Sequence, residues 1–167
     1  MTPRVAIAAA AGLLAAIVTL LSAGPSQAAD AIAGEARIAF NRGDWPAAID
    51  GYRLIVEREP DNARAWFRLG FALHADGRIA EALEAHLKAA EFPEGRGTAL
   101  YNAACACALL GHHDAALATL DEAVTAGFRN LRHLRDDPDF APYHDDERYQ
   151  AVVDRIEALG VEIQLNN

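Results

Sequence analysis

The sequence predicts an all-α fold in which three helical hairpins stack in succession and a final helix covers the last of them. The first observation is a repeat, because rows of 34 residues counted from Ala29 line up three times. The second is that small residues recur at fixed offsets within these rows. The third is that apolar residues in each half of a row follow helical spacing. Repeats of this length indicate stacked units that bury their apolar faces against one another.

The first 28 residues have the features of a secretory signal peptide. Arg4 precedes an uncharged apolar run over residues 5–21, and the small residues Ser26 and Ala28 follow it as a cleavage site. We therefore assign residues 1–28 to the signal peptide, with cleavage after Ala28 and a periplasmic or secreted location. The alternative is an uncleaved membrane anchor, since 17 apolar residues can just span a bilayer.

The chain that remains after cleavage is acidic. Removal of Arg4 from the 15 basic side chains leaves 14 against 24 acidic ones, a formal charge of −10. An acidic exported protein is a poor candidate for binding nucleic acid or anionic lipid. We expect no nucleic-acid partner, and no membrane span once the signal peptide is removed.

Each row is predicted to form two amphipathic helices joined by a glycine turn. The rows cover residues 29–62, 63–96 and 97–130. Small residues in one column indicate close approach of two helices, and a recurring glycine indicates the turn between them. The columns are Ala36, Gly70 and Ala104; Ala48, Ala82 and Ala116; and the turn glycines Gly43, Gly77 and Gly111.

Helix start and stop signals fit these rows. In the first row Asp44 provides an N-cap for the second helix, and Pro46 fits its first turn. In the second row Asp61 or Asn62 caps the first helix, and Pro93 ends the second. The apolar stripe of that first helix comprises Trp66, Leu69, Gly70 and Leu73.

After the third row, residues 131–160 are predicted to cover the apolar face that the last hairpin leaves exposed. Asp137 and Pro138 start a short helix, Asp145 caps the final helix, and Gly160 ends it. Residues 161–167 are left as a tail. The covering side chains are Phe140, Tyr143, Tyr149, Val152, Val153, Ile156 and Leu159.

The three rows resemble the tetratricopeptide repeat, and the resemblance covers residues 29–130. It implies a right-handed α-solenoid of three tetratricopeptide hairpins plus a C-terminal capping helix. The run L-x-x-D-P-D-F from Leu134 resembles the segment that ends many bacterial tetratricopeptide arrays. The matching residues are Trp66-x2-Leu69-Gly70 and Ala82-x3-His86 in row two, Ala48-x3-Tyr52 and Pro60 in row one, and Ala104 and Ala116 in row three.

The resemblance also implies a function and a binding surface. Tetratricopeptide proteins act as scaffolds or adaptors, and a stripe on their first helices lines a concave groove for a partner peptide. Here the stripe is aromatic and basic, which favours a protein or peptide partner with apolar anchors and an acidic group or carboxyl terminus. The predicted groove residues are Arg37, Phe40, Arg64, Phe67, Arg68, Phe71, His74, Tyr101, Asn102 and Cys105.

Two alternatives to the groove stay open. The phenylalanines can pack only against neighbouring first helices while the arginines pair with nearby carboxylates, or the whole surface can complete a larger envelope machine. The family's lysine-and-asparagine carboxylate clamp is not reproduced, because Ala33 and Arg37 stand at its first two positions.

The segment from Tyr101 to Leu117 contains two cysteines, two histidines and an aspartate. Cys105 and Cys107 lie about 200° apart around a helix, so they cannot form a disulfide with each other. The repeat register places Cys107 and His113 at packing positions and His112 in an exposed turn. A zinc site from Cys105 and His112 would lack two ligands.

We therefore predict a structural role for this cluster, with no catalytic residue, cofactor or metal. The chain has no G-x-S-x-G, no glycine-rich phosphate loop and no H-E-x-x-H, which argues against an enzyme. The alternative function is a small redox or metal-handling periplasmic protein that uses Cys105 and His112.

Overall fold

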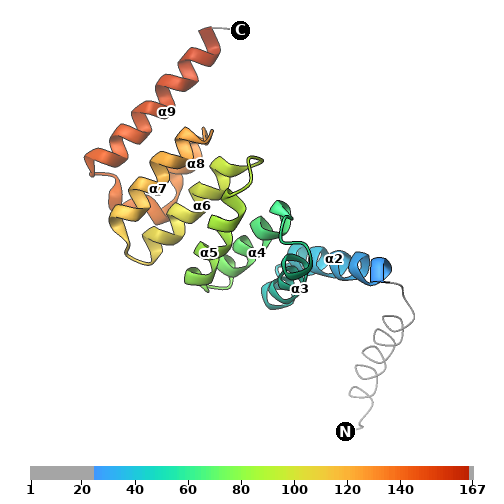
Figure 1. Ribbon diagram of the computed structural model, residues 1–167. Helices are drawn as coiled ribbons and strands as arrows, with labels where there is room; N and C mark the ends of the chain where they lie inside the picture. Colours follow the sequence, from blue (N-terminus) through green and yellow to red (C-terminus); the bar gives the residue numbers. More distant parts are fainter. Residues whose placement is uncertain (1–24, 166–167) are drawn as a thin grey trace.

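The computed structural model describes residues 25–165, with side chains from Ala29 to Gly160. Most of the predicted signal peptide lies outside the described residues. The described part consists of helices and turns, which confirms the all-α class (Figure 1). The elements are α2 (Pro25–Arg42), α3 (Trp45–Arg58), α4 (Ala63–Ala75), α5 (Ile79–Ala90), α6 (Arg96–Leu109), α7 (His113–Thr125), α8 (Leu131–Asp136), the 3₁₀ helix η1 (Pro138–Tyr143) and α9 (Glu147–Leu165).

Consecutive helices pair as hairpins that stack along the chain (Figure 1). Helix α2 packs on α3, α4 on α5 and α6 on α7, while contacts of α3 with α4 and of α5 with α6 join the hairpins. Gly43, Gly77 and Gly111 adopt φ of 72°, 80° and 73° in the turns. Glycine favours this left-handed conformation because it has no Cβ. The described chain is therefore the predicted α-solenoid of three hairpins followed by a terminal helix.

Polar side chains cap several helices. Asp44 and Asn62 accept hydrogen bonds from the N–H groups of Ala47 at 3.3 Å and Ala65 at 3.0 Å. At α9 the cap is Asp146, which accepts from the Arg148 N–H at 2.8 Å, and not Asp145 as predicted. The Gln150 N–H also bonds the carbonyl of Asp146, so the helix begins one residue later than the sequence suggested.

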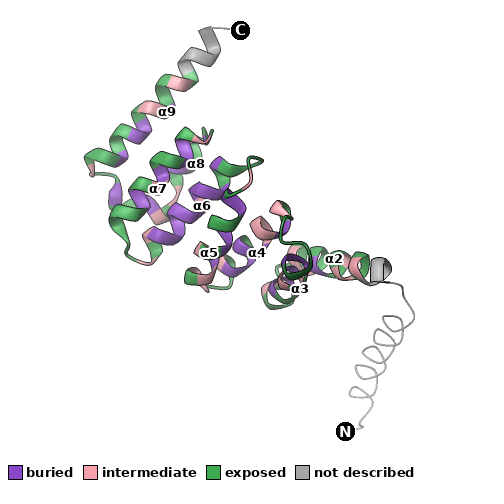
Figure 2. Cartoon of the chain, in the orientation of Figure 1, coloured by how far each residue is buried: buried purple, intermediate pink, exposed green. Residues whose placement is uncertain are grey.

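The apolar interior forms two clusters, one for each end of the solenoid (Figure 2). The N-terminal core joins the first two hairpins and includes the fully buried Ala48 and Ile49. The C-terminal core joins α5, α6, α7 and the segment that follows them. Trp66 contacts both clusters. The recurring small residues lie at the helix contacts, where Ala36, Gly70 and Ala104 are all buried.

The C-terminal segment covers the last hairpin. Element η1 packs on α6, and α9 packs on α7. Helix α9 continues through Gly160 to Leu165, so the predicted end at Gly160 and the predicted tail over residues 161–165 are wrong. A single glycine weakens a helix by about 1 kcal/mol relative to alanine, which is not enough to end it without a left-handed turn. Among the described helices, none is both long and apolar enough to cross a membrane.

The close packing at Gly97 leads to a testable prediction. A Cβ at Gly97 would lie 2.6 Å from the backbone nitrogen of Phe128, so Gly97→Ala must push α6 away from the turn after α7. We expect this variant to lower the free energy of unfolding by about 1–3 kcal/mol, measured by urea denaturation.

The matched control is Gly160→Ala. Gly160 is exposed, and a Cβ there would meet nothing within 4 Å. This change is expected to raise the free energy of unfolding by up to about 1 kcal/mol through helix propensity. Equal stabilisation by both changes would contradict the close contact at Gly97.

Candidate functional site

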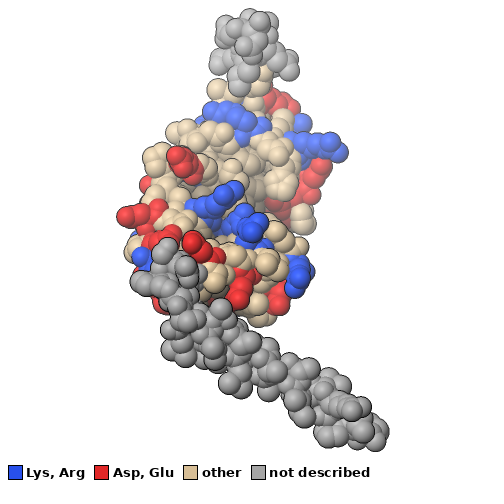
Figure 3. Space-filling model, turned by 90° about the vertical axis from the view of Figure 1, so that its right-hand side faces the viewer, with Lys and Arg blue, Asp and Glu red and all other residues tan. Residues whose placement is uncertain are grey.

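A cleft of about 340 Å³ lies between α2, α3 and α4. Four arginines line it, Arg37 from α2, Arg58 from α3, and Arg64 and Arg68 from α4. We call it the arginine cleft. Figure 3 views the molecule from the side of α2 and α3 and shows basic side chains grouped on this face. The cleft brings together three of the predicted groove residues and adds Arg58, which the sequence did not identify.

Arg68 is held in place by aromatic neighbours rather than by a carboxylate. Its Nη1 donates a hydrogen bond to the Tyr52 hydroxyl at 2.8 Å. Its guanidinium carbon lies 5.5 Å from the centre of the Phe40 ring and 6.0 Å from that of Tyr52. Cation–π contacts of this kind orient the guanidinium without neutralising it.

The arginines of the cleft outnumber its carboxylates, which are Asp30 and Glu59. None of its four arginines forms an ion pair with a carboxylate among residues 29–160. Glu59 accepts a hydrogen bond from Asn62 Nδ2 at 2.7 Å and forms no ion pair with these arginines. The cleft therefore presents positive charge on a protein that is acidic overall, with a formal charge of −9 for the whole sequence.

An aromatic group adjoins the cleft. Phe40, Trp45, Tyr52 and Phe71 form ring contacts with centroid distances of 5.4–6.0 Å across α2, α3 and α4. Phe71 packs against Phe40 of the neighbouring first helix, yet 44% of it stays exposed. The Phe71 ring is therefore packed on one side and still offers an apolar surface beside the arginines.

The second hairpin continues this surface for a short distance. Phe67 is half-buried and, with Arg64, lines a hollow of about 460 Å³ between α4, α5 and α6. His74 is half-buried and, with Phe71 and Asn102, lines a smaller cavity of about 180 Å³. The predicted stripe is thus divided among three neighbouring hollows.

Two predicted groove residues of the third hairpin are not available to a partner. Tyr101 is 1% exposed and stacks on Phe128 with ring centres 4.2 Å apart. Its hydroxyl donates to a carboxylate oxygen of Asp137, and Cys105, 4% exposed, lies beside it. The reason is that α8 and η1 fold back over α6. Of the three predicted groove residues of this hairpin, Asn102 alone stays partly exposed.

The histidines and cysteines of the segment from Tyr101 to Leu117 lie apart from one another. Cys107 is buried in the C-terminal core, and burial raises the pKa of its thiol. His113 is exposed rather than packed, with Nδ1 2.8 Å from the Tyr143 hydroxyl. His112 is exposed before α7 and is not among the residues that line the cavity at Cys105. The Cys105–His112 pair of the alternative function is therefore not formed.

Parts of the sequence are similar to known proteins. Sequence models of the tetratricopeptide repeat match residues 52–84 and residues 97–126. A chloroplastic protein of Arabidopsis thaliana is 33% identical over 87 residues, which cover 50% of this chain. The chain spans only 24% of the length of that protein. These similarities support the tetratricopeptide repeat family, whose members are generally non-enzymatic modules for protein–protein interaction.

Proposed function

We propose that this tetratricopeptide-like chain is an exported, non-enzymatic interaction module of the bacterial cell envelope. It captures a partner peptide that carries an acidic side chain or a carboxyl terminus. The peptide lies over α2 and α4, with its carboxylate in the arginine cleft and an apolar side chain against Phe71. The single observation that carries this proposal is the set of four arginines around one cleft without a carboxylate partner in the described chain.

The chemistry of the cleft suits a carboxylate. Guanidinium groups bind carboxylates through paired, charge-assisted hydrogen bonds, which are roughly twice as strong as neutral ones. Because Tyr52 and Phe40 already position Arg68, less side-chain entropy is lost when a ligand binds. Repeat arrays use such inner surfaces for recognition.

The apolar part of the surface supplies an anchor. Phe71 and Leu54 are 44% and 42% exposed, and Leu54 lines the cleft itself. Aromatic side chains at the centre of an interface contribute much of the binding energy. A peptide that places an apolar residue a few positions from its acidic group would use both features.

The envelope location rests on the signal-peptide pattern of residues 1–28 and on the bacterial array-ending run after Leu134. Export is tested by separating periplasmic and membrane fractions and determining the N-terminus of the recovered chain. A chain that begins at Ala29 supports cleavage. A chain in the cytoplasm with its leader intact contradicts the location, and a membrane-bound chain supports the anchor alternative.

Substitution of the cleft tests the binding proposal. Arg68→Glu reverses one of the four charges, and Phe71→Ala removes the exposed ring. We expect each variant to abolish capture of the partner in a crosslinking pull-down from the envelope fraction, while circular dichroism stays that of the folded chain.

The control for the charge reversal is Arg132→Glu on α8. The Arg132 side chain is 93% exposed and belongs to the opposite end of the solenoid. The Arg132→Glu variant is expected to retain full capture of the partner, although it changes the net charge as much as Arg68→Glu does. Unchanged capture by both Arg68→Glu and Phe71→Ala would remove the proposal.

A further inference from the structure

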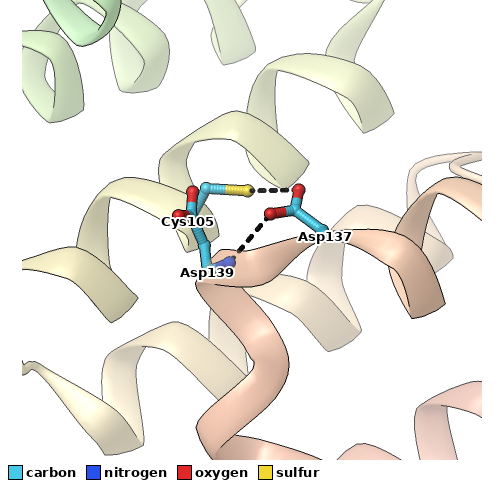
Figure 4. Close-up of side chains that lie close together, drawn as sticks. All are labelled: Cys105, Asp137 and Asp139. Atoms are coloured by element: carbon cyan, nitrogen blue, oxygen red, sulfur yellow. Dashed lines mark hydrogen bonds between the residues drawn. The ribbon is translucent and has the colours of Figure 1, made fainter.

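The cavity beside the covered third hairpin gathers groups that commonly bind metal ions. It measures about 180 Å³ and lies between α4, α6, α8 and η1. Cys105 comes from α6, while Asp137 and Asp139 come from the start of η1 (Figure 4). The ligand atoms of these three residues lie within 4.8 Å of one another. Cys105 is buried, and Asp137 and Asp139 are partly buried.

Two histidines form another part of the cavity wall. His74 Nε2 lies 3.8 Å from Asp139 Oδ2, and its ring centre is 6.3 Å from that of His86. His86 is 1% exposed, and neither of its ring nitrogens has a hydrogen-bond partner among the described residues. A buried imidazole without partners is uncommon, because the unmet hydrogen bonds cost free energy. It is an observation independent of the cysteine–aspartate cluster.

The spacing of the donor atoms suits a small tetrahedral site. With bonds of about 2.0–2.3 Å, the ligand atoms around tetrahedral zinc lie about 3.3–3.8 Å apart. Cys105 Sγ is 3.7 Å from Asp137 Oδ2, and His74 Nε2 is 3.8 Å from Asp139 Oδ2. Each pair therefore has nearly the spacing of two ligands of one ion, although His74 lies outside the three-residue cluster.

The neighbouring hydrogen bonds would hold the carboxylate in place. The Tyr101 hydroxyl donates to Asp137 Oδ2, and the Asp139 N–H donates to Asp137 Oδ1 at 3.0 Å. Such second contacts orient a ligand and are part of most metal sites. Tyr101 thereby acquires a positioning role in place of the groove role predicted from the sequence.

We infer that this cavity binds a zinc-type divalent transition-metal ion through Cys105, Asp137 and Asp139, and that His74 completes the ligand set by a side-chain movement toward this cluster. A thiolate and an imidazole among the donors select a borderline ion such as Zn²⁺ or Co²⁺ over Mg²⁺ and Ca²⁺. Binding releases the thiol proton to solvent and involves no change of oxidation state. His86 and His133 line the same cavity and are further nitrogen donors. The site is separate from the arginine cleft, although Phe71, the proposed anchor for the peptide, also lines its cavity.

Cobalt spectroscopy on the full-length chain tests this site. The protein is purified without a histidine tag, treated with EDTA, freed of the chelator and titrated with Co²⁺. We expect one equivalent to produce the absorption of a thiolate-to-cobalt bond, and Zn²⁺ to displace it. Cys105→Ser is expected to abolish this absorption, and Asp139→Asn to weaken Co²⁺ binding at least tenfold.

The matched control is Cys107→Ser. Cys107 is equally buried and two residues away, but it does not belong to the cluster. This variant is expected to keep the full absorption. The site would be refuted by a wild-type chain that gives no thiolate-to-cobalt absorption, or by an absorption that Cys105→Ser leaves intact. If Cys105→Ser does not fold, Asp139→Asn still tests the site. An unchanged affinity of the Asp139→Asn variant for Co²⁺ also refutes the ligand set.

Discussion

Replacement of Phe140 by alanine is expected to lower the free energy of unfolding by about 3–5 kcal/mol. Phe140 is 0% exposed, and its ring centre lies 5.9–6.1 Å from those of Tyr101, Tyr143 and Tyr149. These neighbours are held by their own contacts and cannot collapse into the space that the ring would leave. The loss therefore includes a cavity as well as the lost burial, and urea denaturation followed by circular dichroism measures it.

The control is the same substitution at an exposed ring. Phe71→Ala is expected to cost roughly half as much or less, because 44% of Phe71 is already in contact with solvent. Loss of Phe140 should also loosen η1 from α6 and speed the alkylation of Cys105 in the folded chain. Equal losses of stability in the two variants, with no change in alkylation, would mean that η1 does not secure the last hairpin.

The hairpins could be predicted because their determinants are local and periodic. Ala48, Ala82 and Ala116 recur at 34-residue intervals, and all three are 0% exposed. A position where two helices nearly touch accepts only a small side chain, so the sequence records the contact directly. The same holds for Gly43, whose positive φ excludes most other residues.

The covered end of the groove could not be predicted in this way. Phe67 and Tyr101 occupy the same column of the repeat, yet Phe67 is half-buried and Tyr101 is 1% exposed. The difference comes from Phe128 and Asp137, which lie far along the chain and cover the ring and the hydroxyl of Tyr101. Helical periodicity tells which face a residue occupies, but not which distant segment covers that face.

Only part of the arginine cleft could be predicted, for a related reason. Arg37, Arg64 and Arg68 belong to first helices, as the groove hypothesis required. Arg58 lies in the last turn of α3, where a basic residue is common because it complements the helix dipole. Its sequence context therefore gave no sign of the cleft, and only the packing of α3 against α4 brings it there.

Replacement of His86 by phenylalanine is expected to stabilise the chain by about 1–3 kcal/mol at pH 7. The imidazole is buried against Gly70 and Phe67, and both ring nitrogens lack partners in the described chain. Phenylalanine removes this unmet hydrogen-bonding capacity and keeps an aromatic ring on the glycine. The adjacent cavity of about 180 Å³ leaves room for the additional ring atom.

The advantage of phenylalanine should grow as the solution becomes more acidic. Burial, reinforced by the charge of His74, lowers the pKa of His86 from 6.5 to about 3. Between these values the unfolded chain binds a proton that the folded chain does not, so stability falls as pH decreases below 6.5. The contribution is about 1.4 kcal/mol per pH unit, or about 2 kcal/mol between pH 7 and pH 5. Carboxylates titrate in both proteins and cancel in the difference.

Urea denaturation of the two proteins in EDTA, at pH 7, 6 and 5, measures this difference without interference from metal ions. His112→Phe is the control, because His112 is exposed and its replacement should change stability by no more than about 0.5 kcal/mol. A constant difference between wild type and His86→Phe across this range would show that the imidazole becomes protonated within the folded chain. The cavity would then already stabilise a charged His86 through Asp139 or water, and the role of His86 as a neutral nitrogen donor would be lost.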